Sequence, residues 1–96
     1  MIKYVIHAKK WRDKINGNTY HAVRVLDTKE HKLISSDFCY GYGDQFMETA
    51  RKTMIKRGWL NSENKRFSVE DYNQIHTIIE NDCKKKEVIA WGNNHY

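Results

Sequence analysis

The residues best suited to bind a ligand gather in the first quarter of the chain, around a tryptophan. Trp11 lies among four cationic side chains, Lys9, Lys10, Arg12 and Lys14. Cationic side chains pair with phosphates, and aromatic rings stack on nucleobases. We therefore expect a binding surface for a phosphate-bearing ligand, formed by Lys9, Trp11, Arg12, Lys14, Tyr20, His21 and Arg24. In the alternative interpretation, Trp11 and Tyr20 cover an edge of the core while the lysines keep the strands soluble.

A second candidate is the turn Tyr40-Gly41-Tyr42-Gly43-Asp44. Its glycines permit the close approach of a ligand, free N–H groups at a helix start attract phosphate, and Tyr40 and Tyr42 offer rings on which a base can stack. Asp44 works against an anion there, because an N-cap carboxylate occupies the same N–H groups. The alternative is a purely structural turn from strand to helix, since the segment matches neither glycine-rich phosphate-binding pattern.

Metal and catalytic chemistry have weaker support. The five histidines are scattered, and His76 and Cys83 are too far apart along a helix to share a zinc ion. Cys39 with a histidine is the one candidate for nucleophilic catalysis, and nothing in the sequence places such a pair together. No spacing supports a nuclease metal site at Asp13, Asp37 and Asp44. We expect no cofactor, no metal site and no catalytic residue.

Length and charge restrict the classes of protein. Ninety-six residues make one domain, 1–96, with one modest core. The formal net charge of +5 favours polyanionic partners and argues against a protein that imitates DNA. Two isolated cysteines suggest a reducing compartment, and we see neither a signal peptide nor a membrane span. These features predict a cytoplasmic location and no membrane partner.

The candidate residues are positioned by a predicted hairpin. Ile2–Trp11 alternates apolar and polar side chains, as a strand does. Asn16-Gly17 is the preferred pair for a two-residue type I′ turn, and Thr19–Leu26 is the returning strand. This turn sets a register in which Ala8 opposes Val25 and Trp11 opposes Ala22. Lys32–Tyr40 is a third strand with a weak middle at Ser35–Asp37.

Two helices and a last strand follow in the predicted order. Asp44 starts a helix that ends near Arg57, with Gly58 and Trp59 forming a Schellman ending. Residues 61–66 form a polar connector. Ser68, with Asp71 as capping-box partner, starts a second helix that extends to Lys86. Residues 87–91 are a short strand, and 93–96 a tail. The fold class is α+β: an antiparallel sheet of about four strands (β-β-β-α-α-β), two helices on one face, and two free edges, one of which is open to self-association.

One resemblance extends over Ile2–Leu60. Gly17-Asn18-Thr19-Tyr20-His21, Val23-Arg24-Val25 and the Tyr40–Asp44 turn, followed by a helix with Thr49-Ala50, resemble a group of small, mostly uncharacterised bacteriophage proteins. The resemblance implies an origin in a phage or prophage and expression in a bacterial cytoplasm. By analogy with small phage accessory proteins, it suggests action against host defence components or on nucleotide signals; it transfers no catalytic residue.

Three functional hypotheses follow. The first is a non-enzymatic phage protein that binds nucleic acid or a signalling nucleotide, used in counter-defence or nucleic-acid metabolism. The second is a protein–protein inhibitor of an acidic host defence component. The third, and weakest, is a small hydrolase of nucleotides or nucleic acid. We also expect that the protein can form homo-oligomers.

Overall fold

The structure is a computed structural model that describes residues 2–60 and 67–93. The expected connector at 61–66 and the tail beyond residue 93 lie outside these residues. The elements are, in chain order, β1 (Tyr4–Asp13), β2 (Asn18–Asp27), β3 (Lys32–Ser35), β4 (Cys39–Tyr40), α1 (Gln45–Lys56), α2 (Val69–Asn73), β5 (Ile75–Glu80) and α3 (Lys85–Asn93).

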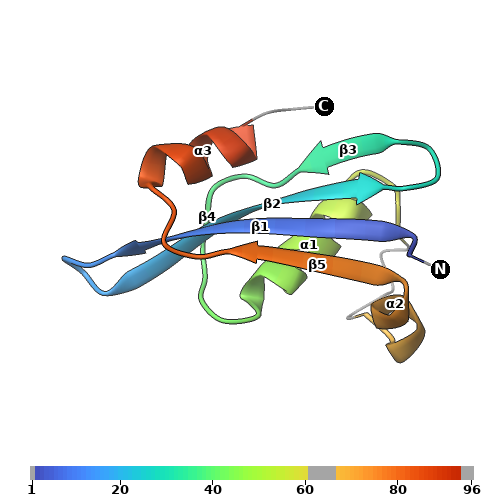
Figure 1. Ribbon diagram of the computed structural model, residues 1–96, viewed down its shortest axis with the longest axis horizontal. Helices are drawn as coiled ribbons and strands as arrows, with labels where there is room; N and C mark the ends of the chain where they lie inside the picture. Colours follow the sequence, from blue (N-terminus) through green and yellow to red (C-terminus); the bar gives the residue numbers. More distant parts are fainter. Residues whose placement is uncertain (1, 61–66, 94–96) are drawn as a thin grey trace.

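The strands form one mixed sheet in the order β3-β2-β1-β5, and β4 also pairs with β2. β1 and β2 make a long antiparallel hairpin, and β5 lies parallel to β1. Figure 1 shows this hairpin projecting beyond the helices at one end of the molecule. The predicted α+β class is confirmed, although the last strand pairs in parallel rather than antiparallel.

The hairpin register differs from the predicted one. Asp13 pairs with Asn18, so the loop contains four residues rather than two, and Ala8 opposes Val23 instead of Val25. The Asp13 carboxylate accepts hydrogen bonds from the N–H groups of Ile15 and Asn16, which stabilises the longer turn. Because each residue moves by two positions along its partner, the side chains stay on their predicted faces.

The main core lies between α1 and the sheet. Phe46, Ala50 and Met54 of α1 are buried against apolar side chains of the first three strands, Ile6, Ala8, Val23, Val25 and Ile34. The Schellman ending is confirmed, since the Trp59 N–H donates to the Met54 carbonyl at 2.7 Å and Gly58 has φ +80°. Asp44 precedes α1 as predicted, but its side chain makes no capping hydrogen bond.

The second half of the chain differs most from its prediction. Ser68 and Asp71 form the expected capping box, and the rings of Phe67 and Tyr72 lie in contact at 5.8 Å. The helix nevertheless ends at Asn73, and Ile75–Glu80 is a strand instead of helix. The spacing of its isoleucines fits both periods, and its β-branched residues favour the strand once β1 offers a free edge.

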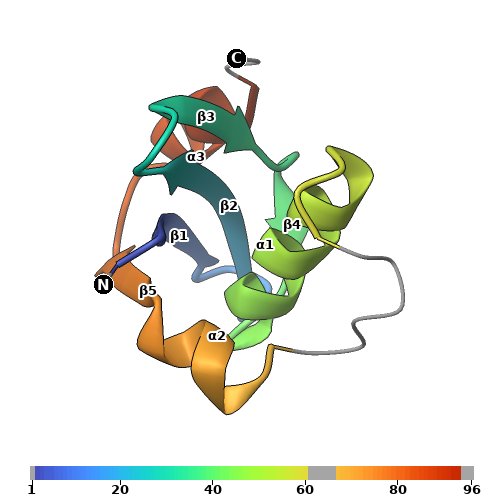
Figure 2. The same cartoon turned by 90° about the vertical axis from the view of Figure 1, so that its right-hand side faces the viewer.

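The last element is a helix where a strand was predicted. α3 lies on the face of the sheet opposite to α1, as the two views in Figures 1 and 2 show. Gly92 permits this contact, because a Cβ there would lie 2.8 Å from the Ser36 carbonyl oxygen and 3.1 Å from the Phe38 nitrogen. In residues 2–60 and 67–93, no helix is long and apolar enough to cross a membrane.

Candidate functional site

Four aromatic side chains gather where the hairpin emerges from the helices. The ring centroids of Trp11 and Tyr20 are 5.5 Å apart and those of Tyr20 and Phe38 are 5.1 Å apart, both in stacked orientations. Tyr40 meets Tyr20 edge-on at 5.6 Å and is 59% exposed. We call Trp11, Tyr20, Phe38 and Tyr40 the aromatic cluster.

Strand pairing explains why these four residues meet. Trp11 lies directly opposite Tyr20 in the hairpin, and Tyr20 lies directly opposite Tyr40 in the β2–β4 pair. The weak middle of the predicted third strand divides it into β3 and β4, and Phe38 lies in the intervening segment. Trp11, Tyr20 and Tyr40 were predicted site residues. Phe38 was not, because it lies outside both the hairpin and the Tyr40–Asp44 turn from which the candidates were drawn.

Cationic side chains surround the cluster. The Lys85 ammonium lies 5.4 Å from the centroid of the Trp11 ring, close enough for a cation–π contact. Beside it is a concavity of about 430 Å³, lined by Trp11, Arg12, Asp13, Lys14, Ile15, Asp82, Cys83 and Lys84. We call this the hairpin concavity. It unites three predicted site residues, Trp11, Arg12 and Lys14, with Lys84, which directly precedes α3 and which the sequence placed at the end of a different helix.

Two carboxylates also line this concavity, and one of them is committed to the turn. The Asp13 carboxylate accepts three hydrogen bonds, two from the Ile15 and Asn16 N–H groups and one from the Asn16 side chain. Chiefly the Asn16 side-chain bond lowers the pKa of Asp13 below its usual value. The Asp13 carboxylate is therefore already occupied by hydrogen bonds within the turn. Its negative charge still offsets part of the positive charge of the neighbouring cations.

The hairpin and the Tyr40–Asp44 turn form adjoining surfaces. The Lys10 ammonium donates to the Gly43 carbonyl at 2.8 Å. Tyr42, which is 62% exposed, lies with Arg12 in a second concavity of about 420 Å³, lined by Lys10, Arg12, Thr19, Tyr42, Gly43, Asn81 and Asp82. Because Arg12 and Asp82 line both concavities, the two candidate patches of the sequence meet along the hairpin.

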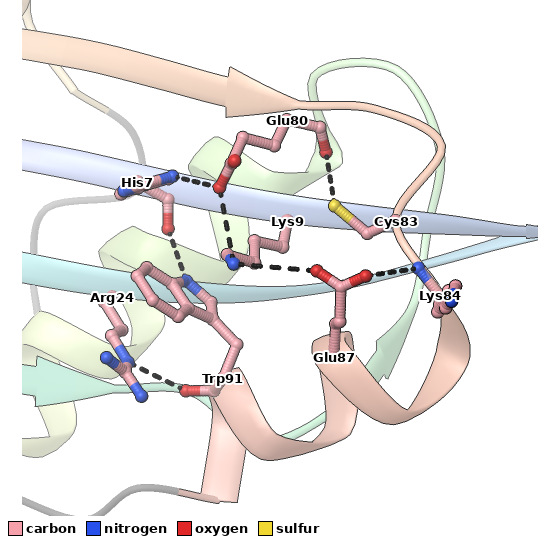
Figure 3. Close-up of polar contacts among 8 residues, drawn as sticks. All are labelled: His7, Lys9, Arg24, Glu80, Cys83, Lys84, Glu87 and Trp91. Atoms are coloured by element: carbon pink, nitrogen blue, oxygen red, sulfur yellow. Dashed lines mark hydrogen bonds and ion pairs between the residues drawn. The ribbon is translucent and has the colours of Figure 1, made fainter.

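Lys9 and Arg24 serve a different purpose from the one predicted. The Arg24 guanidinium lies 3.7 Å from the centroid of the Trp91 ring, and its Nε donates to the Trp91 carbonyl. The Lys9 ammonium lies 4.6 Å from the same ring and within 4.0 Å of both Glu80 and Glu87. Figure 3 shows both cations between the sheet and α3. They hold α3 in place and are poorly available to a ligand.

The same network includes a histidine on β1. His7 Nε2 lies 2.7 Å from a Glu80 carboxylate oxygen, and the Trp91 indole N–H donates to the His7 carbonyl at 3.0 Å (Figure 3). The hydrogen bond from His7 is the main cause of the lowered pKa of Glu80. These contacts link β1, β5 and α3 through polar groups.

His21 does not lie on the surface. It is 1% exposed, and its ring bonds on both sides within the protein: Nδ1 lies 3.2 Å from the Gly41 carbonyl and Nε2 lies 2.6 Å from the Thr49 hydroxyl. Burial lowers its pKa, so the neutral ring is favoured. Its predicted contact with a ligand is incompatible with this position, and the residue instead connects β2 to α1.

Cys39 is adjacent to His21 in the β2–β4 pair, an arrangement that the sequence did not reveal. It lacks the features of a catalytic dyad. The Cys39 thiol donates to the Asp37 carbonyl, and burial raises its pKa, which opposes formation of the nucleophilic thiolate. Within the described ranges, no group of three or more potential metal ligands comes together.

Comparison of the chain with protein-family models, curated proteins and solved structures finds no match. The function is therefore inferred from the side chains of the site.

Proposed function

We propose that the protein binds single-stranded nucleic acid across the aromatic cluster and the hairpin concavity, without catalysing a reaction. The observation that carries this proposal is the stacked set of Trp11, Tyr20 and Phe38 with the Lys85 ammonium over the tryptophan. Aromatic rings beside cations are the usual means by which proteins hold unpaired bases and their phosphates without reading sequence.

The exposed rings supply the stacking part of the proposal. Tyr40 is the most exposed ring of the cluster and is supported edge-on by Tyr20, so one of its faces can receive a base. Tyr42 offers a second exposed ring on the adjoining surface. Stacking of one base on an aromatic side chain contributes about 1–3 kcal/mol to binding.

The cations supply the phosphate-binding part. Arg12, Lys14 and Lys84 line the hairpin concavity, and Lys85 follows at the start of α3. These side chains are drawn from two segments far apart in sequence, and Lys85 lies over the Trp11 ring of the cluster itself. The phosphate backbone of a nucleic acid that lies along the hairpin would therefore contact several cations in succession.

The shape of the two concavities favours a single strand of nucleic acid over a mononucleotide as the ligand. The two concavities adjoin and share Arg12 and Asp82, so together they form an extended surface along the hairpin. A signalling nucleotide is usually held in a site that buries most of its surface. Unpaired bases are also required, because rings can stack only on bases that are not enclosed in a duplex.

The direct test is fluorescence anisotropy with a labelled oligothymidylate over a series of salt concentrations. We expect Tyr40→Ala to weaken binding by about 5- to 150-fold, the equivalent of one stacked base, and Tyr40→Phe to retain most of the affinity. Lys14→Ala and Lys84→Ala should each reduce the salt slope by about 0.7, the value for one phosphate contact on a single strand.

A matched control is Lys29→Ala, which removes an exposed cation from the turn at the other end of β2. It should leave the salt slope unchanged. Binding that is insensitive to Tyr40→Ala, or a slope that Lys29→Ala reduces as much as Lys14→Ala does, would contradict the proposed surface.

Two other results would favour the remaining hypotheses. Binding of a mononucleotide but not of the oligothymidylate would indicate a nucleotide-sequestering protein. No affinity for either, with a stable complex formed on an acidic protein, would indicate an inhibitor. The phage setting and a role in counter-defence remain predictions from the resemblance of the sequence.

A further inference from the structure

β5 is an edge strand of the sheet, and Glu80 at its end is its one acidic residue. It pairs with β1 on one side, and no strand among residues 2–60 and 67–93 pairs with its other side. Alternate residues of such a strand direct their N–H and C=O groups outward, where another strand can bind. Ile78 and Ile79 on its two faces are 37% and 43% exposed.

The opposite edge of the sheet provides a contrast. β3 is only four residues long and starts with Lys32, and its last residue, Ser35, donates a hydrogen bond to the Gly92 carbonyl of α3. Short length, a lysine and a covering element are the devices that prevent association of edges. Between Ile75 and Glu80, β5 contains no lysine, arginine or proline.

We propose that the outer edge of β5 pairs antiparallel with β5 of a second copy of this chain. A two-fold axis perpendicular to the sheet would pass midway between the two copies of Ile78, so that Ile78 of one chain lies directly opposite Ile78 of the other. His76 then lies directly opposite Glu80 of the second copy, on the same face, and this pair occurs twice. The two sheets become one, with both α1 helices on one side and both α3 helices on the other.

The side chains select this register over its neighbours. With the axis at Thr77, His76 would oppose Ile78, and Glu80 would oppose Gln74. With the axis at Ile79, Ile78 would oppose Glu80. The axis at Ile79 does pair Ile79 with its own copy, but at the cost of placing each Ile78 against a carboxylate. Within Ile75–Glu80, the axis at Ile78 combines an isoleucine pair with the pairing of His76 and Glu80, the combinations that stabilise cross-strand pairs. Within one copy, Glu80 contacts His7 and Lys9 of β1, which lie on the inner side of β5. The outer side of β5 is therefore open to His76 of the second copy.

The first test is the mass of the full chain in solution by light scattering across micromolar concentrations. We expect a species of twice the monomer mass of 11.5 kDa. Ile78→Lys should convert it to monomer, because a lysine at the centre of the edge opposes its own copy. Ile15→Lys is the matched control, since Ile15 is 94% exposed in the hairpin loop, and it should leave the dimer intact.

The second test identifies the register independently of any loss of folding. In a background of Cys39→Ser and Cys83→Ser, Ile78→Cys should form an intermolecular disulfide, because directly opposed residues lie within disulfide range. His76→Cys should not, since each copy of residue 76 is four positions from the other. A monomer at all concentrations would overturn the proposal and leave the edge to a segment of another protein. A dimer that survives Ile78→Lys and does not cross-link at 78 would overturn it too.

Discussion

The two faces of the sheet are covered by helices held in different ways. On one face, Phe46, Ala50 and Met54 of α1 are buried among apolar strand residues and lie at most 2% exposed. On the other, Val88 of α3 is fully buried, and much of the remaining contact is polar, through Trp91 and the cations Lys9 and Arg24. Apolar burial fastens the first helix, and hydrogen bonds and cation–π contacts fasten the second.

This difference bears on function. Polar contacts compete with water and contribute less net free energy than burial of a large apolar side chain. We therefore expect α3 to open locally more readily than α1. Because α3 covers only part of its face, the aromatic cluster beyond it remains partly exposed, and the lysines at the start of α3 lie beside it. The aromatic cluster of the proposed binding surface thus lies on the face with the less firmly held helix.

The largest effect should come from the core under α1. Met54→Ala removes a fully buried side chain and leaves a cavity, so we expect a loss of about 2–5 kcal/mol in the free energy of unfolding. Urea denaturation measures it. Lys52→Ala on the exposed side of the same helix should change stability by less than about 0.5 kcal/mol. Equal effects from the two variants would contradict the assignment of α1 to the core.

A smaller effect should follow from Gly92→Ala. The added Cβ would lie 2.8 Å from the Ser36 carbonyl oxygen, a backbone atom that can yield only if α3 shifts. Overpacking of this kind costs about 1–3 kcal/mol. Hydrogen exchange should show lost protection in α3 with α1 retained. If both helices lose protection equally, the two faces are not independent.

Arg24→Met tests the polar contacts that hold α3 on the sheet, and its expected effect on stability is smaller. It keeps much of the aliphatic stem and removes the guanidinium that lies on Trp91 and donates to its carbonyl. Loss of one cation–π contact and one hydrogen bond should cost about 0.5–2 kcal/mol. The hydrogen-exchange protection of α3 should fall again. Unchanged protection would mean that the cation contributes nothing to the docking of α3.

The smallest effect should be the pH dependence that arises at His21, on the α1 face. Burial lowers the pKa of His21 below the unfolded value of about 6.5. Between the pKa values of His21 in the folded and the unfolded chain, the unfolded chain binds more protons than the folded one. The contribution of His21 to the free energy of unfolding is therefore complete above about pH 6.5 and decreases as the pH falls from there towards the folded pKa. One such group gives at most about 1.4 kcal/mol per pH unit.

The control for this prediction is His21→Gln, measured by the same denaturation at about pH 7 and about pH 5. The stability difference between wild type and variant should shrink as the pH falls, because the variant lacks the titrating ring. A difference that grows on acidification would contradict a neutral, buried histidine.

The accuracy of the predictions from the sequence also differs between the two faces of the sheet. The sequence predicted α1 between Asp44 and Arg57, and Phe46, Ala50 and Met54, which are spaced at the helical period, form its buried side. The exposed β5 gave no such guidance: Ile75, Ile78 and Ile79 fit a helical stripe as well as a strand. α3 was missed for a related reason, since it is a short helix with Val88 as its one large fully buried aliphatic side chain and docks otherwise through Trp91 and Gly92.

The candidate site was predicted in part. Trp11, Arg12, Lys14 and Tyr20 lie at one end of the hairpin, as the sequence suggested. The β2–β4 pair brings Tyr40 beside them, which the sequence did not predict. Lys84 and Lys85 join them only because β5 returns beside β1, a tertiary contact with no local signal. The roles of Lys9 and Arg24 were equally hidden, since a cation free for a ligand and one packed on a distant tryptophan look alike in sequence.

The most direct test of the proposed binding surface follows the tryptophan indole N–H resonances of ¹⁵N-labelled protein during titration with an oligothymidylate. Trp11 belongs to the aromatic cluster, whereas Trp59 lies against Tyr4 beyond the end of α1 and serves as an internal reference. We expect the Trp11 resonance to shift progressively to saturation while the Trp59 resonance stays in place. A shift of Trp59 without Trp11, or no shift of either at saturating oligonucleotide, would contradict the account.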